Sequence, residues 1–437
     1  GYTATAGSEL WRTDGTSAGT YMVKDINPGT SGSSITFNNP SNGPTGSTPS
    51  GFFFMASTAA AGAELWFSDG TESGTYMVKD INPGTSGSSP GMASSSCDSC
   101  GLAFLNNVAY FSAVDATNGS ELWRSDGTSA GTYMVKDIYA GAPGSNPRNL
   151  TLFGNRILFS ATDATNGLEL WVSDGTAAGT TLLKDVRPGS SSGLSAAANM
   201  VVSGGIAYFA ADDGTTGREL FRTDGTSAGT TLVKDIQPGT TSGVITSVTP
   251  YNGGVVFYAQ DPTAGFEPFF SDGTSAGTAL IKDVNPGVSS SQPGYNFYFK
   301  AVGSQLFFNA KTALNGDELW ATDATSSGTY MVADIAAGAA SGITNAYVAT
   351  SNGKLYFQAN DLANGAELWV SNGTSGGTLM VKDVNVGGAA AGALYPMAMS
   401  WGVIFSGYQS ATGRELWRSD GTSNGTFLVK EIAASTA

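Results

Sequence analysis

Residues 9–25 read Glu-Leu-Trp-Arg-Thr-Asp-Gly-Thr-Ser-Ala-Gly-Thr-Tyr-Met-Val-Lys-Asp, and variants of this phrase return along the whole 437-residue chain. Each copy predicts a strand, a tight turn at Asp-Gly-Thr and a second strand that ends in Val-Lys-Asp or a close variant. The glutamates that begin the nine copies are Glu9, Glu64, Glu121, Glu169, Glu219, Glu267, Glu318, Glu367 and Glu415. Their spacing of roughly 50 residues identifies a tandem repeat built from short strands.

One complete repeat can be followed between residues 200 and 239. Residues 200–202 and 206–210 are apolar segments separated by two glycines, and residues 219–222 and 231–236 form the repeated strand pair. Four short strands with tight turns make one antiparallel blade of a β-propeller. The sequence therefore predicts an all-β fold, a propeller whose blades stand side by side around one axis.

The repeat count predicts eight four-stranded blades and one additional hairpin. The first copy, within residues 1–29, has no strand pair before it, whereas the eight later copies each have one. We therefore expect a spare N-terminal hairpin at 1–29 and an eight-bladed propeller at 30–437.

A hairpin without a blade suggests a route to self-assembly. The hairpin could sit on the ring as an extra layer, or the chain could be a slice of a longer array. A half blade at one end could also complete a strand set on a neighbouring molecule, which would build head-to-tail polymers. The sequence thus favours an extracellular structural protein that forms a filament or surface layer with copies of itself and is adhesive. The alternative is a secreted propeller module that binds carbohydrate or calcium without catalysis.

Pairing within the first hairpin can be argued from charge and packing. A register that sets Glu9 opposite Lys24 and Trp11 opposite Met22 joins opposite charges and apolar partners, whereas a shift by one residue would oppose Glu9 and Asp25. We expect Glu9, Trp11, Met22 and Lys24 on one face of the hairpin, where they would form the assembly surface.

The ionisable residues favour no reaction. The chain has no histidine, which removes the commonest general base and the usual partner of a serine nucleophile. Most of its 35 Asp and Glu residues occupy repeated positions, and no unusual pair of carboxylates stands apart from them. From the sequence alone, we expect that the protein is not an enzyme.

Acidic loops before the repeated glutamates are candidate calcium sites. Asp-Ala-Thr-Asn-Gly segments offer several oxygen ligands in a short loop, as calcium prefers, but the same segments could cap their own backbone. Some copies carry Thr58, Thr312 or Gln409 in place of the aspartate, which weakens the case for an essential ion. The candidate ligands are Asp115, Asp163, Asp213, Asp261 and Asp361. No cofactor is required by this pattern, and calcium is its one candidate.

Charge and cysteine usage indicate location and partners. The net charge of −15 disfavours nucleic acid, and no long apolar run or basic amphipathic helix predicts membrane insertion. Cys97 and Cys100 lie in a Ser/Gly-rich segment, where a local disulfide is favoured over a redox motif. An acidic chain with a disulfide fits an extracellular or cell-surface location, where glycans are partners to consider.

The repeated phrase resembles the ELWxxDGT-type tandem repeat of large secreted bacterial surface proteins. Residues 64–71, Glu-Leu-Trp-Phe-Ser-Asp-Gly-Thr, match that pattern at every defined position, and the copies at Glu267 and Glu318 depart from it through Pro268 and Ala324. The resemblance covers nearly the whole chain. It implies a propeller-like module in a secreted protein and carries over no catalytic residues.

Overall fold

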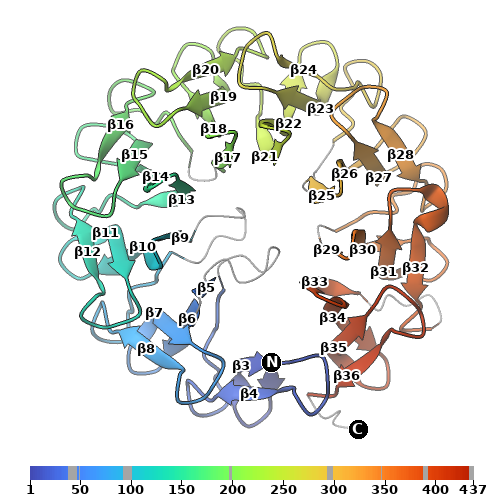
Figure 1. Cartoon of the computed structure of the whole chain (residues 1–437), viewed down its shortest axis with the longest axis horizontal. Coiled ribbons are helices and arrows are strands. Elements are labelled where there is room, and N and C mark those ends of the chain that lie inside the picture. The colour runs from blue at the N-terminus through green and yellow to red at the C-terminus, as the bar shows by residue number, and fades with distance from the viewer. Residues whose placement is uncertain are drawn as a thin grey trace.

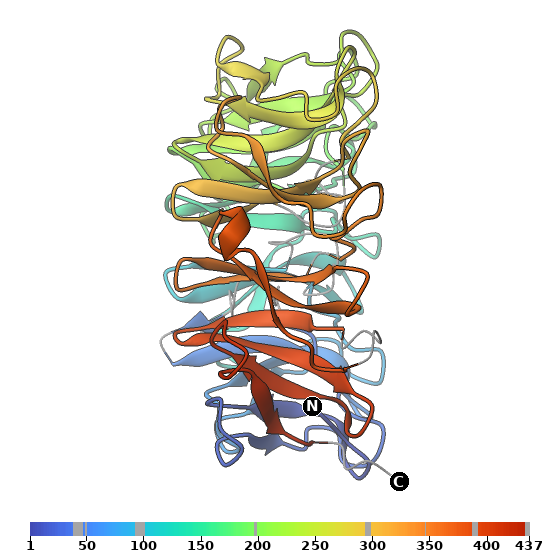
Figure 2. The same cartoon turned by 90° about the vertical axis from the view of Figure 1, so that its right-hand side faces the viewer.

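The computed structural model shows a ring of small antiparallel sheets around a central axis (Figure 1). It describes residues 1–37, 47–48, 50–91, 101–195, 199–292, 299–345, 347–386 and 392–432. Seen from its edge, the ring is a slab with its strands running across the thickness (Figure 2). The prediction of an all-β propeller with eight four-stranded blades and an N-terminal hairpin is confirmed.

Each blade consists of four consecutive strands joined as a meander, with the first strand nearest the axis and the fourth at the rim (Figure 1). The first half of the ring comprises β1 Tyr2–Thr3, β2 Gly7–Ser8, β3 Leu10–Arg12, β4 Tyr21–Lys24, β5 Ser47–Thr48, β6 Gly51–Thr58, β7 Gly62–Ser68, β8 Tyr76–Lys79, β9 Leu102–Leu105, β10 Val108–Asp115, β11 Gly119–Ser125, β12 Tyr133–Lys136, β13 Arg148–Phe153, β14 Arg156–Ala161, β15 Glu169–Ser173 and β16 Thr181–Lys184.

The second half continues the same order, with one short 3-10 turn, η2, in its seventh four-stranded blade. Its elements are β17 Val201–Ser203, β18 Ile206–Asp212, β19 Arg218–Thr223, β20 Thr231–Lys234, β21 Thr246–Tyr251, β22 Gly254–Asp261, β23 Gly265–Ser271, β24 Thr278–Leu280, β25 Lys300–Val302, β26 Gln305–Ala310, β27 Glu318–Thr322, β28 Tyr330–Ala333, β29 Val348–Ser351, β30 Lys354–Asn360, β31 Ala366–Ser371, η2 Ser375–Gly377, β32 Leu379–Lys382, β33 Leu394–Met399, β34 Gly402–Gln409, β35 Gly413–Ser419 and β36 Phe427–Lys430.

The N-terminal hairpin β3–β4 occupies a place of its own in the ring, between β33–β36 and β5–β8 (Figure 1). Leu10, Val23 and Ile26 of this hairpin segment pack with Phe54 and Trp66 of the following blade. On the other side, Lys430 donates from Nζ to the carbonyl oxygen of Thr20 at 2.6 Å. The hairpin therefore has a neighbour from its own chain on each side.

The Asp-Gly-Thr-x-x-Gly-Thr turn is a closed set of hydrogen bonds. In the second copy, Asp69 Oδ1 accepts from the backbone N–H of Thr71 at 2.8 Å and from its hydroxyl at 2.7 Å. The hydroxyl of Thr71 accepts in turn from Gly74 N–H, and Thr75 donates back to the Thr71 carbonyl. A Cβ at Gly74 would lie 2.1 Å from the Asp69 carboxylate, so glycine is required there.

The repeated glutamate is buried and binds backbone rather than lysine. Glu64 is fully buried and accepts from the N–H groups of Ile81, Asn82 and Ser88, and from the Ser88 hydroxyl. It thereby anchors the segment that crosses to the next blade. Buried N–H groups need such acceptors, which explains why a carboxylate recurs at this position.

The predicted register of the hairpin is corrected by a β-bulge. Trp11 faces Met22 as expected, but Lys24 lies opposite Leu10, because the ladder shifts between Leu10 and Trp11. Glu9 turns away and accepts from Ile26 N–H at 2.9 Å and from a serine hydroxyl. Because of the bulge, the predicted pairing of Glu9 with Lys24 does not form, and Lys24 pairs with Leu10 instead.

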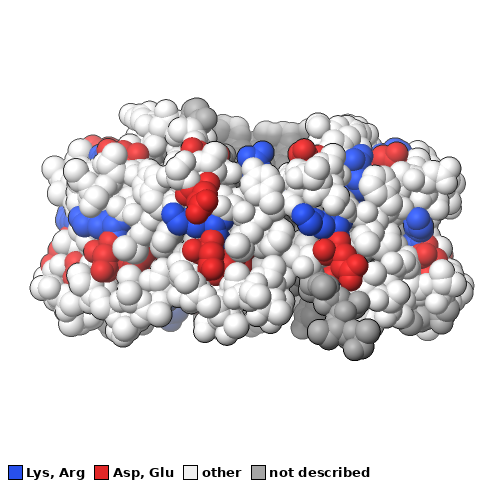
Figure 3. All heavy atoms as spheres, turned by 90° about the horizontal axis from the view of Figure 1, so that it is seen from below, with Lys and Arg blue, Asp and Glu red and all other residues white. Residues whose placement is uncertain are grey.

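The repeated lysine joins neighbouring blades. Lys24 Nζ donates to the Thr75 carbonyl of the next blade at 2.6 Å, and Lys79 and Lys136 make the same bond to Thr132 and Thr180. Figure 3 shows basic and acidic side chains side by side at intervals along the outer wall, with uncharged surface between them. These lysine-to-carbonyl hydrogen bonds therefore connect neighbouring blades at the rim.

The hydrophobic core is a series of layers between blades. Leu65 and Val78 of one blade, for example, pack with Phe111 and Trp123 of the next. These side chains are at least 93% buried, and fully burying such a residue contributes about 1.5–3 kcal/mol. Each blade therefore depends on both of its neighbours.

Candidate functional site

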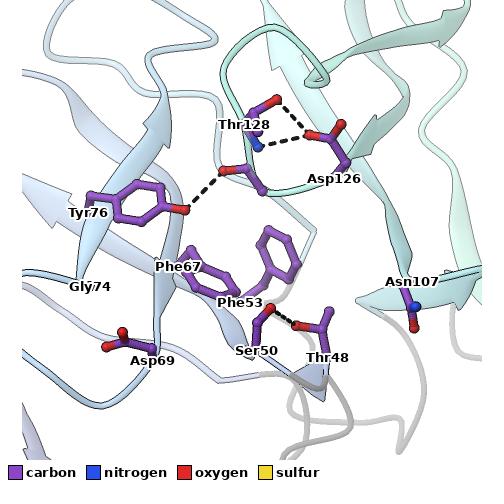
Figure 4. A pocket seen from close by; sticks show the side chains of 11 residues that line it. Thr48, Ser50, Phe53, Phe67, Asp69, Gly74, Tyr76, Asn107, Asp126 and Thr128 are labelled. Atoms are coloured by element: carbon purple, nitrogen blue, oxygen red, sulfur yellow. Dashed lines mark hydrogen bonds between the residues drawn. The ribbon is translucent and has the colours of Figure 1, made fainter.

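A cavity of about 680 Å³ opens between the blades β5–β8 and β9–β12. We call it the inter-blade pocket. Its described lining consists of Thr48, Ser50, Phe53, Phe67, Asp69, Gly74, Tyr76, Asn107, Asp126, Gly127 and Thr128. Figure 4 shows the aromatic rings in the middle, with Asp69 and Asp126 on opposite sides of them.

At the pocket, phenylalanine occupies two positions that carry a Tyr–Arg pair in two other blades and apolar residues in several more. In the neighbouring blade, Tyr110 pairs with Arg124, and two blades further along Tyr208 pairs with Arg222. At the pocket, the corresponding pair is Phe53 and Phe67. The two rings meet edge to face with centroids 5.3 Å apart, and neither sends a polar group toward the next blade.

The difference is visible at the turn glycine of the next blade. A Cβ at Gly175 would lie 2.2 Å from the hydroxyl of Tyr110, which fills the space at that interface. A Cβ at Gly127 would meet only Phe53, at 3.8 Å. Loss of the hydroxyl therefore leaves room beside the turn of β11–β12.

Tyr76 spans the pocket from β8, the outer strand of its blade, to the Asp-Gly-Thr turn of the next blade. Its hydroxyl donates to the Gly127 carbonyl at 3.2 Å (Figure 4), and its ring lies 5.7 Å from that of Phe67. Three aromatic rings thus provide an apolar floor. At the lower edge, Thr48 and Ser50 hydroxyls lie 3.0 Å apart and add polar groups.

The two carboxylates at the rim are held in their ionised forms. Hydrogen bonds from the Thr71 side chain and backbone lower the pKa of Asp69, and the corresponding bonds from Thr128 lower the pKa of Asp126. Each uses Oδ1 for its own turn. No lysine or arginine stands among the described residues that line the pocket, although Arg124 lies near enough to Asp126 to help lower its pKa.

A second cavity, of about 520 Å³, lies where the inner strands β13, β17, β21 and β25 face the axis. Leu152, Val202 and Pro250 contribute apolar wall, and Lys300 is the one ionisable group of its described lining. The polar contacts of this cavity are neutral hydroxyls such as Thr151, which donates to the carbonyl of Met200 at 3.3 Å.

The predicted calcium loops lie one to a blade, and their carboxylates bind their own backbone. Asp115 Oδ1 accepts from the N–H groups of Thr117 and Asn118, and the Asn118 amide donates to both of its oxygens. The loops at Asp163, Asp213, Asp261 and Asp361 repeat this cap. The described part of the chain brings together no three acidic, histidine or cysteine side chains.

The other predicted site residues fall elsewhere. Glu9, Trp11, Met22 and Lys24 lie in the ring, where Glu9 is buried and Lys24 bonds to the next blade. Cys97 and Cys100 lie outside the described residues. Sequence reasoning missed Phe53, Phe67 and Tyr76, although comparing the repeats position by position would have revealed phenylalanine where other copies carry arginine.

Comparison with known proteins supplies the fold and no closer relative. No family model matches the chain, and no curated protein matches it. The similar solved structures include puromycin hydrolase (12% identity, TM-score 0.42, covering 85% of this chain and 56% of that one) and a puromycin-hydrolyzing peptidase of Mycobacterium tuberculosis (9%, 0.44, 98% and 63%). TolB from Acinetobacter baumannii is also similar (12%, 0.32, 69% and 63%).

These comparisons correct the functional expectations. The chain spans less than two thirds of the length of these proteins. The expectation that it is not an enzyme is wrong, because its structural neighbours include peptidases with propellers. The expectation of a filament-forming, adhesive protein, or of a binding module without catalysis, is corrected with it.

The structure adds a physical reason against assembly into filaments through the N-terminal hairpin. The hairpin expected to reach a neighbouring molecule is bonded on both sides within its own ring. At 9–12% identity the likeness concerns the fold alone, and the activities of the peptidases are those of the named proteins. Among the described residues, no helix is long and apolar enough to cross a membrane.

Proposed function

We propose that this propeller binds a ligand with a positively charged group and an apolar part in the inter-blade pocket. The observation that carries the proposal is an aromatic floor, formed by Phe53, Phe67 and Tyr76, between two ionised carboxylates. Aromatic faces attract cations, and desolvated contacts of this kind contribute about 2 kcal/mol. Concave sites with a few well-placed polar groups are the usual form of small-molecule sites.

The test compares matched ligands that differ only in charge. We expect benzylammonium to bind more tightly than benzyl alcohol and benzoate not to bind, as measured by calorimetric titration of the full chain. Equal binding of the three compounds would show that charge plays no part and would overturn the proposal.

Another copy of the repeat shows which substitution of the turn aspartate the fold accepts. Asn372 stands at the turn position of Asp126 in another blade and still accepts from Thr374 N–H and hydroxyl. Asp126→Asn should therefore keep the turn, remove one charge and weaken benzylammonium binding about fivefold, or about 1 kcal/mol. Asp174→Asn makes the same change at another turn and should leave binding unchanged.

We also propose that the protein acts outside the cell or at its surface, as part of the ELWxxDGT-type repeat class. The sequence pI of about 4.3 and the close spacing of Cys97 and Cys100 along the chain support this location. Thiol titration of the denatured protein should find no free thiol. Two free thiols in material exported from cells would contradict the proposed disulfide.

A further inference from the structure

We propose that the inter-blade pocket recognises a guanidinium group, the head of an arginine side chain. This inference rests on the proposed function and narrows its ligand. It comes from what the other blades place in the same position, the residue that follows the repeated aromatic on the third strand. That position carries an arginine in four copies, Phe67 at the pocket, and an apolar residue in the other four copies. The arginines are Arg12, Arg124, Arg222 and Arg418, and the other apolar residues are Val172, Phe270, Ala321 and Val370.

The chain's own arginines show how the interface holds a guanidinium. Arg12 donates from Nη1 to the Gly70 carbonyl in the turn of the next blade at 3.3 Å. Arg222 makes the same bond to the Gly273 carbonyl at 3.0 Å. The carbonyl of the turn glycine is therefore a guanidinium acceptor at these interfaces.

An aromatic ring lies close to three of the four guanidinium groups, whereas Arg222 has Thr231 at the same position. The ζ-carbon of Arg12 is 5.4 Å from the centre of the Tyr21 ring, and that of Arg124 is 5.0 Å from the centre of the Tyr133 ring. Arg418 lies 5.2 Å from the Phe427 ring and 3.9 Å from that of Trp401. In these three copies the first residue of the fourth strand serves as the platform, and it is either tyrosine or phenylalanine.

At the pocket, the platform and the acceptor are present and the arginine is replaced. Tyr76 occupies the platform position, and Gly127 provides the turn carbonyl. The Tyr76 hydroxyl donates to that carbonyl, as Tyr330 does to Gly373 at 3.0 Å where Ala321 replaces the arginine. The hydroxyl thus takes the donor role that a guanidinium has elsewhere.

A guanidinium from a ligand can reproduce at the pocket the carbonyl bond and the ring contact that Arg12 makes at its own interface. It would donate to the Gly127 carbonyl, lie over the Tyr76 ring and approach the free oxygen of Asp126. A planar guanidinium presents several donors and stacks on aromatic faces, whereas an ammonium is a compact, strongly hydrated charge. The arrangement therefore selects arginine over lysine.

The first experiment compares three matched compounds by calorimetric titration of the full chain. These are the N-acetyl amides of arginine, lysine and citrulline, which share a backbone and differ in the head group. We expect the lysine compound to bind at least tenfold more weakly than the arginine compound, and the citrulline compound not to bind. Similar affinities for the arginine and lysine compounds would overturn the guanidinium proposal and leave the broader one standing, whereas binding by neither would overturn both.

The same titration separates a free small molecule from a peptide as the source of the group. Agmatine carries the guanidinium without a peptide backbone, and a capped Gly-Arg-Gly peptide carries it within one. Tighter binding of the peptide supports a protein partner, and tighter binding of agmatine supports a small metabolite. If both bind more weakly than the lysine compound, the proposal is wrong.

Two substitutions at Phe67 test the site, and one of them introduces the arginine that other copies of the repeat carry at this position. Phe67→Arg should fill the pocket with an internal guanidinium, as Arg12 and Arg222 do at their interfaces, and reduce binding at least 20-fold without lowering the melting temperature. Phe67→Leu removes one ring of the floor but adds no internal guanidinium, so it should weaken binding much less than Phe67→Arg does. Unchanged arginine binding by folded Phe67→Arg would overturn the assignment.

Tyr76→Phe, unlike Phe67→Arg, is expected to increase the affinity for the arginine compound. Phe427 already serves as the platform in another blade, so phenylalanine is compatible with the fold. Removing the hydroxyl frees the Gly127 carbonyl for the ligand, and a neutral hydrogen bond is worth about 1 kcal/mol. We expect about fivefold tighter binding of the arginine compound, and weaker binding would contradict the proposed geometry.

Discussion

Lys430 Nζ lies 2.6 Å from the carbonyl oxygen of Thr20, although the two residues are 410 positions apart in the chain. The bond repeats the contact that Lys382 makes with Thr426 within the ring. It joins the last complete blade to the N-terminal hairpin. Ring closure therefore uses the same interaction as six other blade junctions.

Removal of this lysine should loosen the closure. Lys430→Ala is expected to lower the free energy of unfolding by about 1–3 kcal/mol, because a charged donor to a partly buried carbonyl is lost. Chemical denaturation of the variant and the parent provides the measurement. Lys234→Ala removes the equivalent bond to Thr278 inside the ring and serves as its control.

The natural replacement Ala333 shows that one blade junction does without the lysine. A loss far above 3 kcal/mol for Lys430→Ala would therefore mean that closure differs in kind from the other junctions. A variant as stable as the parent would mean that apolar packing alone holds the closure.

Deletion of residues 1–29 should destabilise the ring. The deletion removes Leu10, Val23 and Ile26, which pack against Phe54 and Trp66 of the following blade. Burial of three such side chains contributes roughly 5 kcal/mol or more, so a fall of at least this size is expected. Differential scanning calorimetry of the truncated chain measures the change, and an unchanged melting temperature would show that the hairpin is dispensable.

The fold was predictable because its signals are local and repeated. Turn chemistry at Asp-Gly-Thr, short apolar strands and the period of roughly 50 residues each point to one blade. The register was missed because a bulge between Leu10 and Trp11 moves Lys24 by one position. Facing charges are a weak guide where the ladder is irregular.

The role of the repeated glutamate was hidden for a different reason. Glu64 binds backbone N–H groups of Ile81, Asn82 and Ser88, and backbone donors carry no sequence signature. The pocket, in contrast, leaves a trace in the sequence, since Phe67 stands where four other copies carry arginine. What the sequence could not supply is the contact between that position and the turn of the next blade.

Loss of one buried glutamate should be costly. Glu267→Ala would leave the N–H groups of Val284 and Ser291 without their acceptor, and the Ser291 hydroxyl would lose the shorter of its two hydrogen bonds. Each unsatisfied buried group costs about 1–3 kcal/mol, so we expect a loss of roughly 3–5 kcal/mol. Urea denaturation measures it, with the exposed Glu72→Ala as control; a loss below 1 kcal/mol would show that water replaces the carboxylate.

Stability should depend on pH in a way set by these same carboxylates. Burial raises the pKa of Glu169, Glu219, Glu267 and Glu318 to about 7, from 4.5. Between these values the unfolded chain releases protons that the folded chain retains, so stability falls as the pH rises from about 4.5 to about 7. The turn aspartates have lowered pKa values and act in the opposite sense, since their contribution is lost as the pH falls below about 4.

The melting temperature should therefore be highest near pH 4–5 and decline toward pH 7.5. Each raised glutamate contributes on the order of 1–3 kcal/mol to this decline. Glu267→Gln cannot ionise, so its melting temperature should fall less steeply over this range than that of the parent, even if it is lower throughout. Calorimetric scans at half-unit steps, with the soluble fraction checked near the pI, provide the measurement. A melting temperature that rises steadily from pH 5 to pH 7.5 would show that these glutamates are already ionised in the folded ring.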